Sequence, residues 1–226
     1  MRKYCYNSVK EGHKMQSGDP IQDKNLRISV NKRTEFALKE MKKRVYIKDV
    51  LEIGSATGYS SNLLFREGYN VRGIEFNSES IKVAKKRYPH IIFEEESAED
   101  YCRGHYDAII LLDVIEHIRD YKKALKNIHY MLKPQGILII TTDNVKYTKN
   151  LYEYSTKEFT YEELKELLPD SKIMGSGFHY VYTKPITFLF GAFYAIKFRY
   201  LFNFVAKYFP KWSNTFYLVV KKKGEK

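Results

Sequence analysis

Two acidic residues and a loop of small residues follow one another in the first half of the chain. Glu52 lies inside the apolar run VLEI, the loop Gly54–Gly58 follows at once, and Glu75 ends the next apolar run, VRGIE. Glycines let the backbone turn tightly and approach a ligand, and a helix that begins behind them presents free N–H groups. An acid at the end of the second strand suits hydrogen bonds to ribose hydroxyls. The pattern predicts a nucleotide-type ligand, with a structural salt bridge as the alternative for Glu75.

A second acidic cluster, in the sequence DVIEH, has the spacing of a helical turn. Asp113, Glu116 and His117 stand at positions i, i+3 and i+4, so they converge if a strand runs directly into such a turn. Histidine titrates in the range that suits removal of a phenolic or enolic proton. Two interpretations stay open. His117 with Glu116 acts in base catalysis, or both residues shape the floor of the ligand pocket and cap the next helix.

Short apolar runs alternate with amphipathic stretches across residues 48–143. The strand-like runs are 48–53, 70–75, 90–94, 106–112 and 136–142, and the helix-like stretches are 58–67, 78–88 and 118–132. Such alternation is typical of βαβ units and of a mostly parallel sheet covered on both faces. We therefore expect a doubly wound α/β fold, in which ligands bind at the carboxyl ends of the strands.

Local signals predict further elements outside this alternation. A helix is expected over 31–44, behind a loose polar arm at 1–25. Asn77 or Ser78 can cap the second helix-like stretch, and Thr160 with Glu163 forms a capping box that opens a later helix. Pro134 and Gly136 predict a turn before the strand GILIITT, and two last strands are expected near 172–180 and at 213–223.

Length, charge and cysteine content restrict the class of protein. The chain has 226 residues and a formal net charge of +12. The length suits one domain, and the charge favours anionic partners, although a solvated basic face explains it equally well. Cys5 and Cys102 are far apart in sequence and indicate neither a disulfide framework nor a metal site. No secretory signal or spanning stretch is apparent, so we expect a cytoplasmic protein.

The segment 186–209 is unusually aromatic, and its polar members Arg199, Asn203 and Lys207 fall on one helical stripe. One interpretation is a lid or a peripheral membrane contact for an apolar or lipid-linked acceptor, with basic residues near anionic headgroups. The other is a homodimer contact or a helix packed on the sheet. We expect a main domain at 46–226 that contains this segment as a helical insertion at about 185–211, after an N-terminal arm and helix at 1–45.

Four stretches in this order resemble the successive motifs of class I S-adenosylmethionine-dependent methyltransferases. They are EIGSATG, IEFN, YDAIILLDVIEHIRD and LKPQGILIITTDN. The resemblance is to the small-molecule and quinone-type branch, and it covers residues 48–145 closely and 155–222 loosely. It implies a Rossmann-like methyltransferase fold with a seven-stranded, mostly parallel sheet, helices on both faces, and S-adenosylmethionine as the cofactor.

The resemblance also implies roles for individual residues. Glu52 and the loop would face the methionine part of the cofactor, Glu75 the ribose, and Asp113 the methionine amino group. The implied cofactor-binding set is Glu52, Gly54, Ser55, Ala56, Gly58, Glu75, Phe76, Ser97, Ala98 and Asp113. Glu52 can then stand in an apolar strand because it faces a cationic ligand, or because loop N–H groups satisfy its carboxylate.

Two positions depart from the motifs of that family. Ala56 replaces a common glycine, which leads us to expect a negative φ at this residue. Ser97 stands where an aspartate is frequent, so the adenine contact passes to Ser97, Glu96 or a backbone carbonyl. The pair Glu116 and His117 is linked to a divalent ion in some quinone-type relatives, although we expect no metal here.

The expected activity is methyl transfer to a small-molecule acceptor, with an O-methylated apolar or phosphorylated acceptor as the first hypothesis. Two alternatives are an RNA methyltransferase and a non-catalytic module that binds the cofactor. Enzymes that methylate amino groups of flipped bases carry an Asn/Asp-Pro-Pro-aromatic motif where this chain has LLDVIEH. Nucleic acid is therefore the less favoured substrate.

Overall fold

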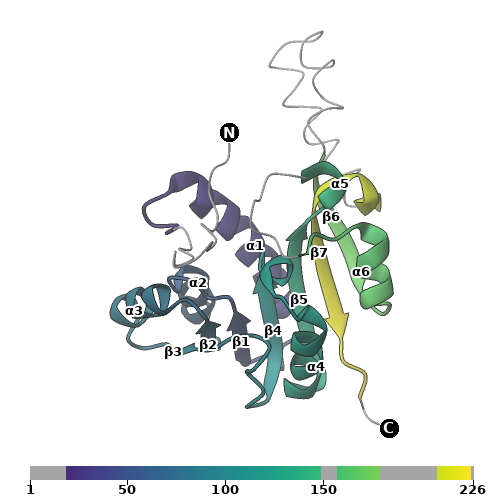
Figure 1. Cartoon of the computed structure of the whole chain (residues 1–226). Coiled ribbons are helices and arrows are strands. Elements are labelled where there is room, and N and C mark those ends of the chain that lie inside the picture. The colour runs from purple at the N-terminus through teal and green to yellow at the C-terminus, as the bar shows by residue number, and fades with distance from the viewer. Residues whose placement is uncertain (1–18, 149–156, 179–207, 225–226) are drawn as a thin grey trace.

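The computed structural model describes residues 19–148, 157–178 and 208–224. They form one sheet in the order β3-β2-β1-β4-β5-β7-β6 (Figure 1). The strands are β1 Asp49–Ile53, β2 Asn70–Glu75, β3 Ile92–Glu95, β4 Tyr106–Leu112, β5 Leu132–Asp143, β6 Lys172–Phe178 and β7 Ser213–Lys221. Only the pairings that involve β7 are antiparallel among these strands. The prediction of a seven-stranded, mostly parallel sheet is confirmed.

Helices cover both faces of this sheet. They are α1 Lys24–Lys42, α2 Tyr59–Arg66, α3 Ser78–Arg87, α4 Tyr121–Met131, α5 Val145–Thr148 and α6 Tyr161–Leu167, with the 3₁₀ turns η1 Ile115–His117 and η2 Pro210–Trp212. Leu138 and Ile140 of β5 pack in one apolar cluster with α4 and α6, whereas Ile137 and Ile139 pack in a second cluster with α1, α2 and α3. Because successive side chains of a strand point to opposite faces, the sheet has two cores. The doubly wound fold is confirmed.

The structure confirms the predicted capping box and, of the two candidate caps Asn77 and Ser78, selects Asn77. The Asn77 side chain accepts a 2.9 Å hydrogen bond from the Ser80 N–H at the start of α3. Thr160 and Glu163 form both halves of the capping box that opens α6. These contacts satisfy backbone N–H groups that a helix start leaves without intrahelical partners.

The N-terminal helix is longer than the prediction of 31–44. It begins at Lys24 because the Asp23 side chain accepts hydrogen bonds from the N–H groups of Asn25 and Leu26, at 2.8 and 3.1 Å. The prediction of a loose arm up to residue 25 is therefore wrong for its last part, and residues 1–18 lie outside the described part of the chain. Since Ala37 and Met41 are fully buried, α1 belongs to the layer that covers the sheet.

Strand β5 also begins earlier than predicted, at Leu132. Leu132 pairs with Tyr106 of β4, and the register then shifts before Ile137 pairs with Ala108. The predicted turn at Pro134 and Gly136 is thus an irregularity within the strand, in which extra residues bulge out of the ladder.

Most of the predicted aromatic insertion at 185–211 lies outside the described residues. At its described end, Tyr208 and Phe209 are exposed, and η2 leads into β7. No helix in the described ranges combines the length and the apolar character needed to cross a membrane. The proposed boundary near residue 45 stays a prediction.

Candidate cofactor site

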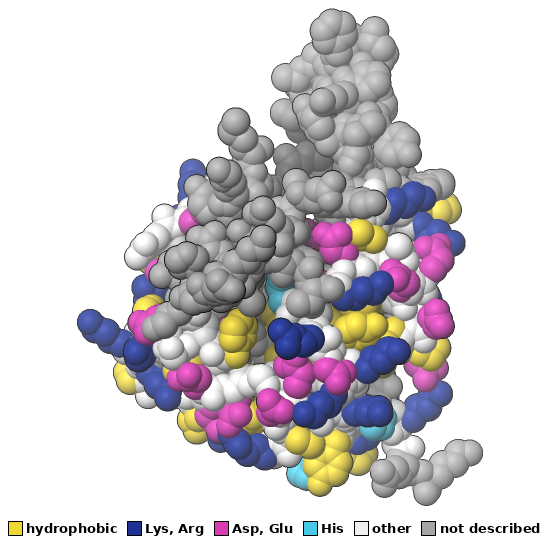
Figure 2. Space-filling model, in the orientation of Figure 1, with side chains coloured by type: hydrophobic (Ala, Val, Ile, Leu, Met, Phe, Trp, Pro, Cys, Tyr) yellow, Lys and Arg dark blue, Asp and Glu magenta, His cyan; other side chains and the backbone are white. Residues whose placement is uncertain are grey.

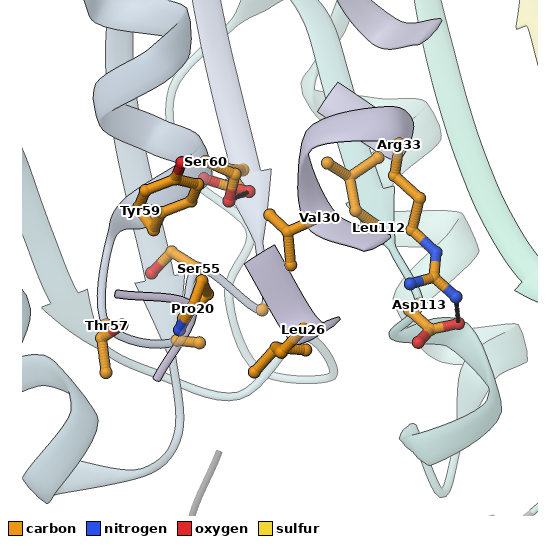
Figure 3. A pocket seen from close by; sticks show the side chains of 13 residues that line it. Pro20, Leu26, Val30, Arg33, Ser55, Thr57, Tyr59, Ser60, Leu112 and Asp113 are labelled. Carbon is orange, nitrogen blue, oxygen red and sulfur yellow. Dashed lines mark hydrogen bonds and ion pairs between the residues drawn. The ribbon is translucent and has the colours of Figure 1, made fainter. Parts of the chain in front are cut away.

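A small cavity lies at the carboxyl ends of β1 and β4, beneath the start of α1 (Figure 3). In an open α/β sheet this is where the strand order reverses and ligands bind. Its lining residues come from the N-terminal segment, from the loop after β1 and from the end of β4: Pro20, Leu26, Val30, Arg33, Glu52, Gly54, Ser55, Ala56, Thr57, Tyr59, Ser60, Leu112 and Asp113. The sheet thus brings together predicted site residues that stand far apart in the sequence.

Glu52 is buried at this cavity. Its carboxylate oxygens accept hydrogen bonds from the Ser60 and Ser61 hydroxyls in the first turn of α2. Burial raises the pKa of Glu52 to about 7, although the serine hydrogen bonds oppose the shift. The partners of Glu52 are therefore hydroxyl groups of α2, and the expectation of loop N–H donors is wrong.

The loop after β1 depends on left-handed backbone conformations. Gly54 and Gly58 have φ of 75° and 80°. A side chain at Gly54 would clash, because an added Cβ would lie 2.4 Å from a methyl of Val114. Ala56 also has a positive φ, of 47°, so the prediction of a negative φ at this position is wrong. The loop turns at Ala56 so that its N–H donates to Glu75 at 3.1 Å, which imposes a conformation that alanine disfavours.

We expect the substitution Ala56→Gly to raise the free energy of unfolding by about 0.5–1 kcal/mol, because glycine adopts a positive φ without the cost that a Cβ brings. Part of the gain is lost to the greater freedom of glycine in the unfolded chain. Urea denaturation of the variant beside the natural chain measures the change, and Ala98→Gly, at a position without positive φ, serves as the destabilised control. A less stable Ala56→Gly variant would contradict strain at this residue.

Glu75 stands beside the loop at the end of β2. Its carboxylate accepts N–H groups from Ala56 and Asn77, at 3.1 and 3.0 Å. Burial raises the pKa of Glu75, against the effect of these hydrogen bonds. The adjacent side chain of Phe76 is 49% exposed, so an aromatic face stands open next to the acid. Among the described residues Glu75 forms no salt bridge, so its local contacts favour the ribose interpretation over the structural one.

Ser97 and Ala98 follow the strand β3, next to Glu75. The Glu96 N–H donates to the Glu75 carbonyl oxygen at 3.1 Å, which fixes the start of this loop beside β2. The Ser97 hydroxyl donates to Asp100 at 2.7 Å. Five residues of the predicted cofactor-binding set do not line the small cavity: Gly58, Glu75, Phe76, Ser97 and Ala98.

Asp113 directly follows β4 and lies next to a cation, Arg33, that the sequence analysis did not predict. Arg33 of α1 donates to the Asp113 carboxylate at 2.8 Å (Figure 3). Arg33 also lies 3.7 Å from Asp143 at the end of β5. Nearby carboxylates raise the pKa of Arg33, although burial opposes this. A sequence signal existed: Arg33 precedes the buried Ala37 and Met41 at helical spacing, on the inward stripe of α1. Asp113 itself has a φ of 66°, so the chain turns sharply where it leaves the strand.

Glu116 and His117 belong to the 3₁₀ turn η1, directly after Asp113. Glu116 is buried, and both its burial and the charge of Asp113 raise its pKa well above the ordinary value. Of the three residues predicted to converge, Asp113 and Glu116 therefore lie close enough for the charge of one to act on the other. His117 is partly buried, and its role stays a prediction. Within residues 19–148, 157–178 and 208–224, no His, Cys, Asp and Glu side chains form a group of three or more that could hold a metal ion.

Comparison with known families identifies this arrangement. A family model described as a methyltransferase domain matches residues 23–181, which is more than half of the chain. The chain belongs to this methyltransferase domain family. The match spans α1, the carboxylates and the DVIEH turn, and it supports the resemblance drawn from the four motifs.

Curated proteins that the chain matches are distant relatives. A ubiquinone biosynthesis O-methyltransferase of Colwellia psychrerythraea is 26% identical over 140 residues, which cover 58% of this chain and 54% of that protein. A probable S-adenosylmethionine-dependent methyltransferase of Mycolicibacterium smegmatis is 24% identical over 144 residues, which cover 61% and 56%. The chain thus spans about half the length of the curated relatives that it matches.

Solved structures of other methyltransferases share the fold. An S-adenosylmethionine-dependent methyltransferase of Clostridium acetobutylicum has a TM-score of 0.64 at 14% identity. The aligned region covers 90% of this chain and 97% of that protein. The magnesium protoporphyrin IX methyltransferase of Synechocystis, solved with bound S-adenosylmethionine, has a TM-score of 0.59 at 12% identity, covering 88% and 83%. These likenesses establish the Rossmann-like methyltransferase fold.

Proposed function

We propose that this protein transfers the methyl group of S-adenosylmethionine to a small-molecule acceptor. The observation that carries the proposal is the placement of Glu52, Glu75 and Asp113 at the carboxyl ends of the adjacent strands β1, β2 and β4, with Glu52 and Asp113 lining the cavity and Glu75 bonded to the loop at Ala56. Such an acidic edge suits a cationic nucleoside. The comparisons give the RNA alternative no support, since neither the ubiquinone biosynthesis O-methyltransferase nor the other relative named above carries a nucleic-acid description.

The residues present fit the cofactor chemically. Asp113 and Arg33 lie side by side, so together they match the ammonium and carboxylate groups of a methionine. Glu75 accepts hydroxyl hydrogen bonds from ribose, and Phe76 offers an apolar face for adenine. The Ser55 hydroxyl lines the cavity and is buried without a hydrogen-bond partner among the described residues, so it is available to a ligand. When bound, the cofactor supplies an activated methyl group on a sulfonium.

The segment from Asp19 to Arg33 must move for this cofactor to enter. The cavity encloses about 60 Å³, whereas sites for ligands of this size enclose roughly 300–1,000 Å³. Pro20, Leu26 and Val30 line its outer wall, and Asp19 holds this wall by two 3.0 Å hydrogen bonds from Arg87. We regard the structure as the closed form of the site.

Catalysis then depends on positioning and on removal of an acceptor proton. A sulfonium donor is already activated, so alignment of donor and acceptor in a site without water supplies much of the rate enhancement. Glu116 and His117, beyond Asp113 on η1, are the proposed base for a hydroxyl acceptor. A structural role for both residues predicts instead that their substitution lowers stability and leaves the pH profile of turnover unchanged.

Titration calorimetry with S-adenosylmethionine and S-adenosylhomocysteine tests the proposal directly. We expect both to bind, and we expect radioactive methyl transfer from S-adenosylmethionine to an acceptor. An alkyl catechol and phosphoethanolamine are suitable acceptor probes, because one is apolar and phenolic and the other is a phosphorylated amine. If neither cofactor form binds, the proposal fails; binding without turnover on these probes or on a small-molecule extract would favour the non-catalytic module.

Affinity for S-adenosylmethionine should rise with pH through about 7, because the raised pKa of Glu52 keeps it protonated below that value. A cationic ligand favours the ionised carboxylate, so the dissociation constant should fall about tenfold between about pH 6 and about pH 8. The stability of the free protein should change with pH in the opposite direction. Protonated Glu52 contributes fully to the free energy of unfolding below the pKa that it has in the unfolded chain, and this contribution is lost as the pH rises through about 7. Calorimetry in buffers of different ionisation heat should detect proton release on binding.

The variant Glu52→Gln is the control for this pH dependence. We expect it to bind S-adenosylmethionine more weakly and with an affinity that hardly changes over the same pH range. A variant that keeps the full pH dependence would show that another group, such as Glu116, titrates instead.

A contact with membranes through 186–209 and a homodimer remain further proposals. Support for them comes from the aromatic and basic composition of that segment and from the exposed Tyr208 and Phe209 at its end. Co-flotation with anionic vesicles, compared with neutral ones, tests the membrane contact, and light scattering tests the dimer. If the protein neither floats with anionic vesicles nor forms a dimer, packing on the sheet is the role that we assign to the segment.

A further inference from the structure

A second hollow lies between α4 and α6, on the face of the sheet that those helices cover. This groove encloses about 810 Å³. Its floor is apolar and consists of side chains from both helices, β5 and β7: Leu125, Leu132, Leu138, Leu167, Leu168 and Val220. Leu132 begins β5, whereas the Asp143 that faces Arg33 ends it. The groove therefore lies toward the start of β5, and the cofactor site lies at its carboxyl end.

Lysines surround this apolar floor. The rim contains Lys122, Lys126, Lys221, Lys222 and Lys223 against a single acid, Asp170. Figure 2 shows Lys and Arg side chains beside a His in the lower right part of this face, where Figure 1 places α4 and the end of β7.

Two of these lysines already have partners. Lys223 pairs with Asp170 at 3.0 Å, and Lys222 donates to the carbonyl oxygens of His129 and Leu132 at 2.8 and 2.7 Å. Lys122, Lys126 and Lys221 form no ion pair with the described residues and are exposed. The rim therefore keeps uncompensated positive charge next to apolar surface.

The charge of the rim restricts what can fill the groove. The segments 1–18 and 179–207 of this chain each contain more Lys and Arg than Asp and Glu, so they repel the rim. A second copy of the chain, with a net charge of +12, is disfavoured for the same reason. Segments 149–156 and 225–226 carry no net charge, so charge does not exclude them, but the positive rim favours an anionic occupant from outside the chain.

The size and floor of the groove restrict the occupant further. Sites for small ligands enclose roughly 300–1,000 Å³ and are mostly apolar with a few polar groups at their edge. A flat membrane surface cannot reach the floor of a hollow, whereas a single aliphatic chain can lie along it and leave its head group at the rim.

We propose that the groove between α4 and α6 binds an anionic amphiphile, a single aliphatic chain with a phosphate or carboxylate head group. The leucine floor removes the chain from water, and this burial supplies most of the affinity. Lys122 and Lys126, one helical turn apart on α4, hold the head group. The site is separate from the cofactor site, so the inference does not depend on the proposed methyl transfer.

Titration calorimetry of the full chain with dodecyl phosphate, below its critical micelle concentration, tests this proposal. Dodecanoate tests whether a carboxylate head group replaces phosphate, dodecanol removes the charge, and inorganic phosphate removes the chain. We expect the two anionic amphiphiles to bind, dodecanol to bind at least about tenfold more weakly, and inorganic phosphate not to bind measurably. Failure of both anionic amphiphiles to bind, or equal affinity for dodecanol, overturns the proposal.

A matched pair of variants locates the head group. Lys122→Glu with Lys126→Glu should weaken binding of dodecyl phosphate about tenfold, because two attractive contacts become repulsive. Lys85→Glu with Lys86→Glu on α3 changes the net charge equally on the other face of the sheet and should leave binding unchanged. All of these lysines are exposed, so the fold should survive both changes. Equal weakening by both pairs would indicate a general charge effect and overturn the assignment.

Two further measurements distinguish this groove from the cofactor site. Dodecyl phosphate should slow hydrogen exchange of amides in α4 and α6, and saturating S-adenosylhomocysteine should not change its affinity. Binding that S-adenosylhomocysteine abolishes would place the amphiphile in the cofactor or acceptor pocket and overturn the proposal. A chain that binds dodecyl phosphate but no S-adenosylhomocysteine supports the groove and contradicts the proposed enzyme.

Discussion

Replacing Arg33 by Met is expected to lower the free energy of unfolding by about 3 kcal/mol, because it leaves buried carboxylates without their cation. Arg33 is the guanidinium between Asp113 and Asp143, at 2.8 and 3.7 Å, and the side chains of all three are less than one fifth exposed. Glu116 adds a third nearby acid, whose charge also acts on Arg33. Loss of the cation therefore concentrates negative charge in a site of low dielectric constant.

Urea denaturation at about pH 8 and about pH 5 measures this effect and its sign. In the variant the folded-state pKa values of the acids rise, so their contribution to stability is lost as the pH increases. The deficit of Arg33→Met should consequently be larger at the higher pH. Lys32→Met is the matched control, since it removes one positive charge from an exposed neighbouring position of α1.

A double-mutant cycle attributes the loss to the ion pair with Asp113. Adding Asp113→Asn to Arg33→Met should restore part of the lost stability, because one of the uncompensated charges is removed with it. If the two substitutions destabilise additively, the contact between Arg33 and Asp113 contributes little. In that case packing of the arginine side chain accounts for the loss.

Replacing Glu75 by Gln is expected to weaken binding of S-adenosylhomocysteine about 100-fold. The estimate follows from two hydrogen bonds between a carboxylate and ribose hydroxyls, each worth about 1.5–3 kcal/mol, of which an amide keeps a part. The free energy of unfolding should change by less than about 1 kcal/mol. The neutral glutamine loses the hydrogen bonds of a carboxylate, but it also avoids the cost of burying a charge, which is the cost that raises the pKa of Glu75. A structural salt bridge at this position would produce the opposite pattern, with stability lost and affinity kept.

Calorimetry with S-adenosylhomocysteine and parallel urea denaturation separate these outcomes. Glu95→Gln is the matched control, since Glu95 is the partner of Glu75 in the register of β2 and β3 and is exposed. It should bind S-adenosylhomocysteine like the natural chain. Unchanged affinity in Glu75→Gln would remove Glu75 from the cofactor site.

The sequence by itself determined the elements and the order of the acidic motifs. Strands β2 and β4 have the predicted bounds, because apolar runs of this length between turn residues pair as buried strands in any compact arrangement of this chain. Helix starts at Asn77 and Thr160 were equally predictable, since a side-chain cap acts on backbone groups only a few residues away. Once parallel strands are assigned, their carboxyl ends meet at one edge, and Glu52, Glu75 and Asp113 must lie there.

Only the tertiary structure decided how this edge is completed. Arg33 stands far from Asp113 in the sequence, and their contact exists because α1 packs against the sheet with that face inward. The positive φ of Ala56 follows from its hydrogen bond to Glu75 on another strand, which outweighs the local preference of alanine. The hydroxyl partners of Glu52 are likewise set by where α2 begins. Local propensity fixes elements over a few residues, whereas charge pairing and backbone strain depend on contacts that form only when the layers pack.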